Sequence, residues 1–212
     1  VRDTQLRGTE PMGRIQNDAY YTPPDLARAV VARTVPRLEH RQGQRRILEP
    51  SVGTGNLARA LSEALPGCHI TGVEIDPQEE GCEACNLTVI GDFLKVKSLT
   101  SYDLILANPP YNGVVEHISR ALDHLAVGGL AAFLVRSDLL NTRKLLSLCA
   151  GRDWYPRWED RLVGRPSFVG TNGTGRYNYS LVTWSDTNLV GVEYCETRWL
   201  DWREVSRGQN AT

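Results

Sequence analysis

Apolar residues along 20–150 fall into short continuous runs that alternate with stretches of helical spacing. The runs are rich in Ile, Leu and Val, which favours buried strands. We expect these strands at residues 47–49, 70–74, 87–90, 102–107 and 130–135. Between the first two, Leu57, Leu61 and Leu65 lie on one face of an expected helix. Because strands alternate with helices, the pattern predicts a parallel sheet with helices on both faces.

Three further helices are expected from the same spacing. One follows Thr22, which is expected to be its N-cap, with Pro23 and Pro24 in the first positions, where proline is tolerated. The other two cover about 114–126 and 138–149.

After residue 150 the helical spacing disappears, and aromatic residues alternate with glycine-rich turns. We expect two or three antiparallel strands here, at about 157–165, 178–185 and 189–196, which close one edge of the sheet. The glycine-rich loop 170–175 is expected to be mobile. The expected fold is therefore α/β, with a mostly parallel seven-stranded sheet and an antiparallel edge.

The length of 212 residues is enough for one domain with its own core. We expect a flexible arm at 1–17 and a single domain at 18–212 that has a β-rich C-terminal end and no large target-recognition domain. The apolar share of 41% and the charged share of 23% are those of ordinary globular proteins, and no apolar run is long enough to span a membrane. The polar N-terminus does not resemble a signal peptide, and the five scattered cysteines favour a reducing compartment, so a cytoplasmic location is expected.

The net charge of −1 hides an uneven distribution of charge. Residues 28–46 contain six arginines and one glutamate, and residues 136–176 contain eight basic and four acidic residues. The segment 47–135 between them contains eleven acidic and four basic residues. A phosphate-binding surface needs a basic patch rather than a basic protein. The two basic segments therefore allow a nucleic-acid partner, although arginines that merely coat a solvated surface would give the same pattern.

The first candidate site is the glycine loop from Glu49 to Gly55, between an expected strand and an expected helix. Its glycines allow backbone amides and a helix N-terminus to approach a ligand, although such a loop alone often only packs a helix against a strand. Glu74 ends the next strand, where a carboxylate can accept both hydroxyl groups of a ribose. A carboxylate at Glu49 is unfavourable beside a pyrophosphate. S-adenosylmethionine, with its ammonium and sulfonium charges, therefore suits this loop better than NAD.

The second candidate site is the tetrapeptide Asn108-Pro109-Pro110-Tyr111 at the carboxyl end of the fourth expected strand, which faces the same crevice as the glycine loop. The Asn108 side-chain oxygen and the Pro109 carbonyl can each accept one N–H of an exocyclic amine such as N6 of adenine. This frees the nitrogen lone pair for in-line attack on a methyl group. The two prolines hold the acceptors rigidly, and Tyr111 offers a flat face on which a base can stack.

With these motifs the sequence resembles the S-adenosylmethionine-dependent amino-methyltransferases, and in particular short, phage-associated DNA adenine-N6 methyltransferases. The resemblance covers residues 20 to about 184, and the motifs occur in the order of that family. They are YYTPP (20–24), ILEPSVGTGNLA (47–58), ITGVEIDP (70–77), GDF (91–93), YDLILANPPYN (102–112) and RPSFVGTNGTGRYNYSLVTW (165–184). The resemblance implies a Rossmann-like methyltransferase fold with S-adenosyl-L-methionine as cofactor. It also implies methyl transfer to adenine N6 in DNA, by base flipping and direct in-line transfer.

The resemblance assigns residues to three tasks. The catalytic set is the tetrapeptide from Asn108 to Tyr111. The implied cofactor-binding set is Tyr21, Thr22, Pro23, Glu49, Ser51, Gly53, Gly55, Glu74, Ile75, Asp92, Phe93 and Asn108. In this set Asp92 would bond the adenine amine of the cofactor, and Phe93 would lie against the adenine ring.

On the substrate side, Tyr111 and Phe168 would contact the target base from opposite faces. Tyr177 and Tyr179 are alternatives to Phe168 for this stacking role. Phosphate contacts are expected from the basic segments 28–46 and 136–176, and Arg165 and Arg176 are the leading candidates.

Other functions stay open. The same tetrapeptide occurs in enzymes that methylate adenine or guanine in RNA, or glutamine in proteins. A non-catalytic subunit could bind only cofactor or DNA, although the intact Asn108 counts against it. Since few residues follow the last motif, sequence specificity is expected to be short or relaxed, or to come from loops, a partner protein or a second copy of the chain.

The remaining reactive residues have structural interpretations. Cys82 and Cys85 form a C-x-x-C pair without a second pair or a histidine at zinc-binding spacing, so no metal is expected. His117 and His124 are expected to be surface or packing residues of their helix rather than general bases.

Overall fold

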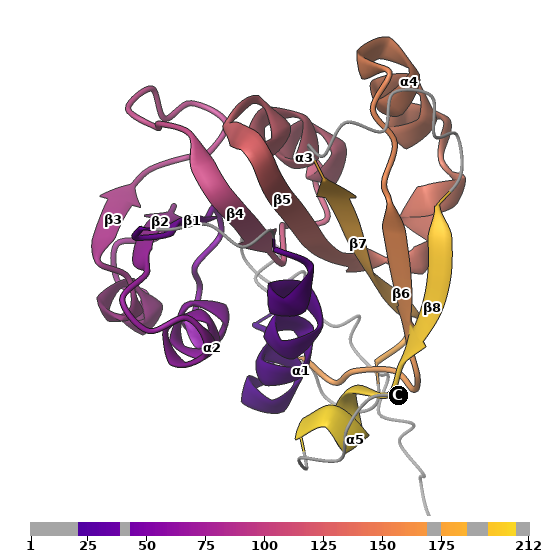
Figure 1. Ribbon diagram of the computed structural model, residues 1–212, viewed down its shortest axis with the longest axis horizontal. Coiled ribbons are helices and arrows are strands. Elements are labelled where there is room, and N and C mark those ends of the chain that lie inside the picture. Colours follow the sequence, from indigo (N-terminus) through magenta and orange to yellow (C-terminus); the bar gives the residue numbers. More distant parts are fainter. Residues whose placement is uncertain (1–20, 39–42, 169–174, 186–194, 207–212) are drawn as a thin grey trace, which may run out of the picture.

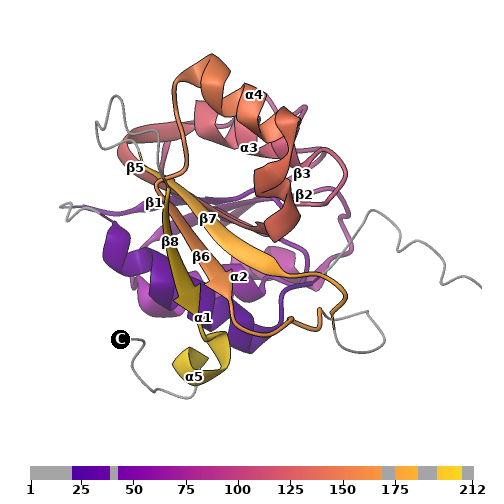
Figure 2. The ribbon, with the colours of Figure 1, turned by 90° about the vertical axis from the view of Figure 1, so that its right-hand side faces the viewer.

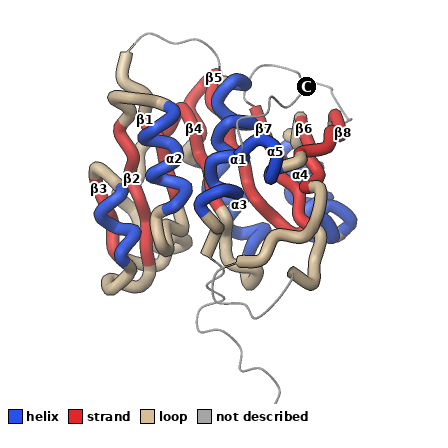
Figure 3. Tube along the Cα trace, turned by 90° about the horizontal axis from the view of Figure 1, so that it is seen from below, coloured by secondary structure: helices blue, strands red, loops and turns tan. Residues whose placement is uncertain are grey.

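The computed structural model describes residues 21–38, 43–168, 175–185 and 195–206. These residues form an eight-stranded sheet in the order β3-β2-β1-β4-β5-β7-β6-β8, which can be followed across Figure 3. The arm expected at 1–17, most of the loop 170–175 and most of the strand expected at 189–196 lie outside the described residues.

The first five strands are parallel to one another, as the alternating pattern predicts. They are β1 (Arg46–Glu49), β2 (His69–Glu74), β3 (Leu87–Ile90), β4 (Tyr102–Ala107) and β5 (Leu125–Arg136). β1 lies between β2 and β4, with Ile47 opposite both Ile70 and Leu104. The chain thus changes direction across the sheet at β1 and β4, and ligands of open α/β sheets bind at such a point.

The other end of the sheet is formed by β6 (Trp158–Leu162), β7 (Tyr179–Ser185) and β8 (Glu196–Leu200). β7 lies between β5 and β6 and is antiparallel to both, which gives the expected antiparallel edge. β8 is parallel to β6, with Trp158 opposite Glu196. The expectation of seven strands is therefore corrected to eight, because the last strand pairs with β6 in register from Glu196 to Leu200.

Helices cover both faces of the sheet (Figures 1 and 2). One face carries α1 (Pro24–Thr34), α2 (Asn56–Ala64) and α5 (Trp202–Ser206), whose residues Leu26, Leu61 and Trp202 belong to one apolar cluster. The opposite face carries α3 (Val114–Asp123) and α4 (Arg143–Arg152), with Ile118 and Leu145 in a second cluster. Both clusters consist of buried apolar side chains, so the sheet is a rigid support for the loops at its strand ends.

Two parts of the helical pattern differ from expectation. The helix expected at 138–149 is a 3₁₀ turn (η4, Ser137–Asn141) followed by α4, because Thr142 accepts a hydrogen bond of 3.3 Å from the Leu145 N–H and starts a new helix. Helix α5 was not expected. Short 3₁₀ turns also occupy η2 (Val35–Arg37) and η3 (Glu80–Ala84). In the described part of the chain, no helix has the length and apolar character needed to cross a bilayer.

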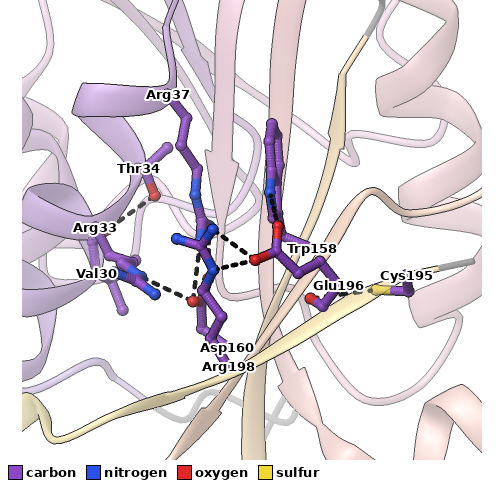
Figure 4. Close-up of polar contacts among 9 residues, drawn as sticks. All are labelled: Val30, Arg33, Thr34, Arg37, Trp158, Asp160, Cys195, Glu196 and Arg198. Carbon is purple, nitrogen blue, oxygen red and sulfur yellow. Dashed lines mark hydrogen bonds and ion pairs between the residues drawn. The ribbon is translucent and has the colours of Figure 1, made fainter. Parts of the chain in front are cut away.

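An ion-pair cluster ties α1 to β6 (Figure 4). The side chain of Asp160 has 0% exposure, and its oxygens accept hydrogen bonds from Arg33 Nε at 2.7 Å and Arg37 Nη1 at 2.5 Å. The guanidinium of Arg37 also lies 4.9 Å from the ring centre of Trp158. Arg33 and Arg37 of the basic segment 28–46 therefore neutralise a buried carboxylate. We no longer expect these two arginines to contact phosphates.

Candidate functional site

A cavity of about 740 Å³ opens beside the carboxyl ends of β1, β2 and β4. Its lining comes from five of the motif segments and, outside them, from Glu79 and His117. The lining residues are Tyr21, Thr22, Glu49, Pro50, Ser51, Val52, Gly53, Thr54, Asn56, Leu57, Val73, Glu74, Ile75, Asp76, Glu79, Gly91, Asp92, Phe93, Asn108, Pro110, Asn112 and His117. Five of them are carboxylic acids, and none is a lysine or an arginine. Such a cavity attracts a cation and disfavours a phosphate.

The glycine loop adopts a backbone that other residues rarely adopt. Gly53 and Gly55 have φ of +49° and +73°. A Cβ atom on Gly53 would meet the Tyr21 ring at 2.9 Å, and one on Gly55 would meet the Gly81 carbonyl oxygen at 2.7 Å. The absence of a side chain at Gly53 therefore leaves room for the Tyr21 ring in the cavity wall. Gly55 is the N-cap of α2 and packs on Gly81, and it is not among the lining residues.

Glu74, at the end of β2, is fixed by two backbone amides. The Gly53 N–H donates to Oε2 at 2.7 Å, and the Asp76 N–H donates to Oε1 at 2.9 Å. The side chain is buried, yet it lines the cavity. A carboxylate oxygen has more than one lone pair, so each oxygen can accept a further hydrogen bond from a ligand hydroxyl.

Glu49, at the end of β1, is 1% exposed, and its Oε2 has no hydrogen-bond partner among the described residues. Burial raises the pKa of Glu49 well above its usual range and nearby Glu74 adds to the rise, while a hydrogen bond with the Ala58 backbone opposes it. A buried acceptor without a partner is costly unless a ligand satisfies it. The position of Glu49 in the cavity wall makes a cationic ligand the natural partner.

Asp92 and Phe93 follow β3 and line the cavity. Asp92 accepts hydrogen bonds of 3.0 Å from Leu94 N–H and from Lys95, and the latter bond lowers the pKa of Asp92. Phe93 is buried, with its ring centre 5.6 Å from that of His117.

His117 was expected to be a surface or packing residue, but it is buried and lines the cavity. Its Nδ1 lies 3.0 Å from the carbonyl oxygen of Gly113, one helical turn earlier. If Nδ1 carries the proton, Nε2 is the acceptor of the ring. Burial lowers the pKa of His117, so the neutral ring is favoured. The position of His117 within its helix did not indicate a site. His117 reaches the cavity because α3 packs beside Phe93, which follows β3.

The segment before α1 closes one side of the cavity. Tyr21 donates a hydrogen bond to Glu79, and this bond together with burial raises the pKa of Tyr21 to about 12. Thr22 was expected to cap α1, but the N-cap is Pro23, and no side chain caps the helix. The Thr22 hydroxyl instead accepts a hydrogen bond of 3.1 Å from Asn108 Nδ2. Pro23 is not among the lining residues.

The tetrapeptide lies at the carboxyl end of β4, beside the same cavity. Asn108 and Pro110 line it, while Pro109 is buried behind them. Tyr111 is half-buried, its hydroxyl contacts that of Tyr179, and the two ring centres are 6.4 Å apart. The structure thus brings together Asn108, which is expected to be catalytic, and most of the expected cofactor residues.

The second aromatic expected at the target base does not have an open face. Phe168 is 3% exposed, and its ring centre is 4.8 Å from that of Tyr179, so it belongs to the apolar core. Tyr177 is 44% exposed, and the Arg136 guanidinium lies 3.7 Å from its ring centre and 6.0 Å from that of Tyr111. Of these two rings, that of Tyr177 is exposed in the structure and that of Phe168 is not, while the ring that stacks on the base stays a prediction.

Of the expected phosphate-binding residues, Arg165 and Arg176 have exposed side chains near the start of β7. Arg165 Nε donates to Asn178 Oδ1 at 3.3 Å. In contrast, Arg152 is held by Asp123 at 2.7 Å, and Arg161 by Glu159 at 3.1 Å. The cysteines form no cluster that suits a metal ion: within the described residues, no three Cys, His, Asp or Glu side chains meet as ligands would.

Comparison of the sequence with curated proteins finds methyltransferases, although no protein-family model matches the chain. The chain is 36% identical over 115 residues to the type II methyltransferase M.TthHB8I of Thermus thermophilus, covering 54% of this chain and 24% of that protein. It is 26% identical over 184 residues to the type II methyltransferase M.CvrRI of Paramecium bursaria Chlorella virus XZ-6E, covering 75% and 47%. A third relative is a tRNA1(Val) (adenine(37)-N6)-methyltransferase of Bacteroides thetaiotaomicron, 36% identical over 81 residues, covering 33% and 34%. The chain spans less than half the length of these relatives. The expected resemblance to DNA methyltransferases is confirmed.

Comparison with solved structures identifies the fold. A protein of Listeria monocytogenes, described as a class I S-adenosylmethionine-dependent methyltransferase, has a TM-score of 0.70 at 14% identity, covering 92% of this chain and 74% of that chain. A methyltransferase subunit of a type I restriction-modification system from Streptococcus thermophilus has a TM-score of 0.61 at 13% identity, covering 80% and 45%. The fold is therefore the Rossmann-like methyltransferase fold, and its expected cofactor is S-adenosyl-L-methionine. The acidic cavity with the unpartnered Glu49 oxygen fits that cationic cofactor.

Proposed function

We propose that this chain transfers the methyl group of S-adenosylmethionine to the N6 amine of adenine in DNA. The observation that carries the proposal is the position of Asn108 at the end of β4, on the wall of an acidic cavity. A cation-binding cavity and a rigid pair of amine acceptors are the two parts that methyl transfer to an amine requires. The names of the relatives, type II and type I restriction-modification methyltransferases, support a role in DNA modification.

Three carboxylates are assigned to the cofactor. Glu49 would balance the positive charge of its ammonium and sulfonium groups, Glu74 would accept its ribose hydroxyls, and Asp92 would accept its adenine amine. When bound, S-adenosylmethionine supplies an electrophilic methyl group. The side chains hold these positions before binding, because Glu74 is fixed by two backbone amides and Asp92 by Leu94 and Lys95.

Asn108 and Pro109 act on the target amine. The lone pair of an adenine amine is delocalised into the ring, which makes the nitrogen a poor nucleophile. Acceptors on both N–H groups draw the nitrogen towards tetrahedral geometry and stabilise the positive charge that develops during transfer. Asn108 Oδ1 and the Pro109 carbonyl are these acceptors, and the two prolines restrict their backbone.

The target adenine must leave the duplex to reach Asn108. Flipping a base costs a few kcal/mol, and a stacking contact with an aromatic ring returns about 1–3 kcal/mol. Tyr111 provides one such ring, and Tyr177, with Arg136 against it, provides a second face at the same end of the sheet. Arg165 and Arg176 would contact the phosphates of the strand.

Adenine in RNA is the second candidate substrate. It is favoured by the similarity to the tRNA adenine-N6 methyltransferase of Bacteroides thetaiotaomicron. The two candidates share the chemistry at Asn108 and differ only in the polymer that carries the base. A partner protein or a second copy of the chain would contribute further sequence recognition.

The proposal is tested by incubating the chain with S-adenosylmethionine carrying a tritiated methyl group and with plasmid DNA, transfer RNA or a glutamine-containing protein. The nucleic acids are then digested to nucleosides and the protein to amino acids, and chromatography identifies the labelled product. We expect N6-methyldeoxyadenosine from plasmid DNA, formed at least about a hundredfold more slowly by the Asn108→Ala variant. Label in RNA or protein alone would replace DNA as the substrate. Cofactor binding without transfer to any of the three would indicate a non-catalytic subunit.

A further inference from the structure

We infer that Thr22 is a positioning residue for Asn108: its hydroxyl holds the Asn108 amide by the nitrogen end, and the oxygen end serves the target amine. The inference rests on the proposed function for the role of Asn108. It gives Thr22 a task beyond the cofactor-binding role that the resemblance implies.

The orientation of this amide decides whether the site can work. The oxygen and nitrogen ends of a carboxamide have nearly the same size, so packing alone does not distinguish them. With Oδ1 towards the substrate, Asn108 accepts an N–H of the amine. With the amide turned over, its NH₂ group would meet the NH₂ group of the target, and an acceptor needed in the transition state would be lost.

The Thr22 hydroxyl is placed to hold the Asn108 amide. Asn108 Nδ2 donates to Thr22 Oγ1 at 3.1 Å, although the two residues are 86 positions apart in the sequence. Thr22 is only 6% exposed, so little water competes for this contact. In the orientation observed, the N-terminal segment holds the nitrogen end of the amide, and the oxygen end takes the acceptor role.

The backbone of Thr22 is itself fixed. Asn56 Nδ2 donates to the Thr22 carbonyl at 2.9 Å and lies 3.2 Å from Thr54 Oγ1, which ties the segment to the glycine loop. Pro23 follows directly, and a residue before proline is restricted to extended conformations. The branched Cβ of threonine also limits its side-chain rotamers. These restraints explain why Thr22 contacts Asn108 and does not cap α1.

Two substitutions separate the hydroxyl from the shape of Thr22. Thr22→Val keeps the branched shape and removes the hydroxyl, while Thr22→Ser keeps the hydroxyl. We expect the single-turnover rate of methyl transfer to fall about tenfold in Thr22→Val, as for the loss of one hydrogen bond, and to stay within about threefold in Thr22→Ser. The Kd for S-adenosylmethionine, measured by calorimetry, should change by less than about threefold in both. Thr22→Ala is the substitute if Thr22→Val does not fold.

The hydrogen bond between Thr22 and Asn108 can also be measured without any substrate. The side-chain NH₂ signals of Asn108 in a ¹⁵N NMR spectrum are identified by their loss in Asn108→Asp. We expect these signals to shift, and their exchange with water to become faster, in Thr22→Val but not in Thr22→Ser. If the native chain methylates no substrate, the proposed function fails, and these spectra alone decide whether Thr22 holds the amide.

The inference is overturned by any of three results. Equal loss of rate in Thr22→Val and Thr22→Ser would mean that shape, not the hydroxyl, is responsible. A fall in cofactor affinity that matches the fall in rate would make Thr22 a cofactor residue only. Unchanged Asn108 signals in Thr22→Val would show that the hydroxyl does not hold the amide.

Discussion

Arg37 and Asp160, which are 123 positions apart in the sequence, form a buried ion pair in which Nη2 of Arg37 lies 2.9 Å from Oδ1 of Asp160. The pair joins the 3₁₀ turn η2 to β6, and Arg33 completes the cluster from the adjoining helix α1 (Figure 4). Because α1 begins directly after the Thr22 segment, this attachment also fixes the N-terminal wall of the cavity. The charges of the basic segment 28–46 are therefore partly structural.

Removing the buried carboxylate is expected to destabilise the fold. Asp160→Ala leaves Arg37 and Arg33 without their shared partner, and breaking such a buried pair costs about 3–5 kcal/mol of unfolding free energy. The matched control is Glu196→Ala, which removes the exposed partner of Arg198 and should cost much less stability. Urea denaturation measures both variants. Equal losses would contradict the structural role of the pair.

Glu49 is expected to couple cofactor binding to pH. Its pKa in the folded state is raised above the reference value of 4.5, so the protonated form stabilises the fold at low pH. That contribution is lost as pH rises through the folded-state pKa. Glu49→Gln cannot ionise, so the cofactor-free variant should lose less stability than the native chain as pH rises above about 4.5.

The same substitution should weaken the binding of S-adenosylmethionine, because the cation loses its charged partner. The measurement is the melting temperature against pH, with and without cofactor. A native profile that matches that of Glu49→Gln in both conditions would remove Glu49 from the site.

Glu74 and Asp92 are expected to contribute separately to cofactor affinity. Glu74→Ala and Asp92→Ala should each weaken binding of S-adenosylmethionine by about 1–3 kcal/mol, as for lost charge-assisted hydrogen bonds. Glu63→Ala, on the exposed side of α2, is the control and should leave the Kd unchanged. Calorimetry gives the three values. A variant with native affinity would show that its carboxylate does not bind the cofactor.

Asn108→Ala is expected to affect turnover and not cofactor binding. It deletes an acceptor used mainly in the transition state, so turnover should fall by about 10² or more while the Kd for S-adenosylmethionine stays constant. Single-turnover kinetics and calorimetry on the same sample check the two quantities. Parallel loss of both would make Asn108 a cofactor-binding residue.

The exposed arginines near β7 are expected to bind phosphates. Phosphate contacts release counterions, so DNA affinity should fall with salt with a log–log slope of about −0.9 per contact. Arg165→Ala or Arg176→Ala should flatten the slope by about one unit and weaken all sequences alike. Arg46→Ala is the control: although Arg46 belongs to the basic segment 28–46, it lies at the amino end of β1, at the opposite end of the strands from Arg165 and Arg176. Affinity independent of salt would exclude phosphate contacts and favour a protein substrate.

The order of elements and the main parts of the site were determined by the sequence itself. Apolar spacing marks β1 to β5 because a buried strand and an amphipathic helix need different periods over a few neighbouring residues. Glu49, Glu74 and Asn108 could be assigned because each comes at the end of such a strand, and the ends of parallel strands meet at one edge. Gly53 and Gly55 were recognisable for the same local reason, since their backbone angles require glycine.

Only the tertiary structure decided the contacts between distant segments. No local pattern indicates that Thr22 turns to Asn108 instead of capping its helix, that Asp160 neutralises Arg37, or that His117 reaches the cavity. Phe168 and Tyr177 are both aromatic residues in one motif, yet packing on Tyr179 buries the first and leaves the second exposed. Periodicity depends on a residue's immediate neighbours, whereas burial and side-chain partners depend on how the helices pack across the sheet.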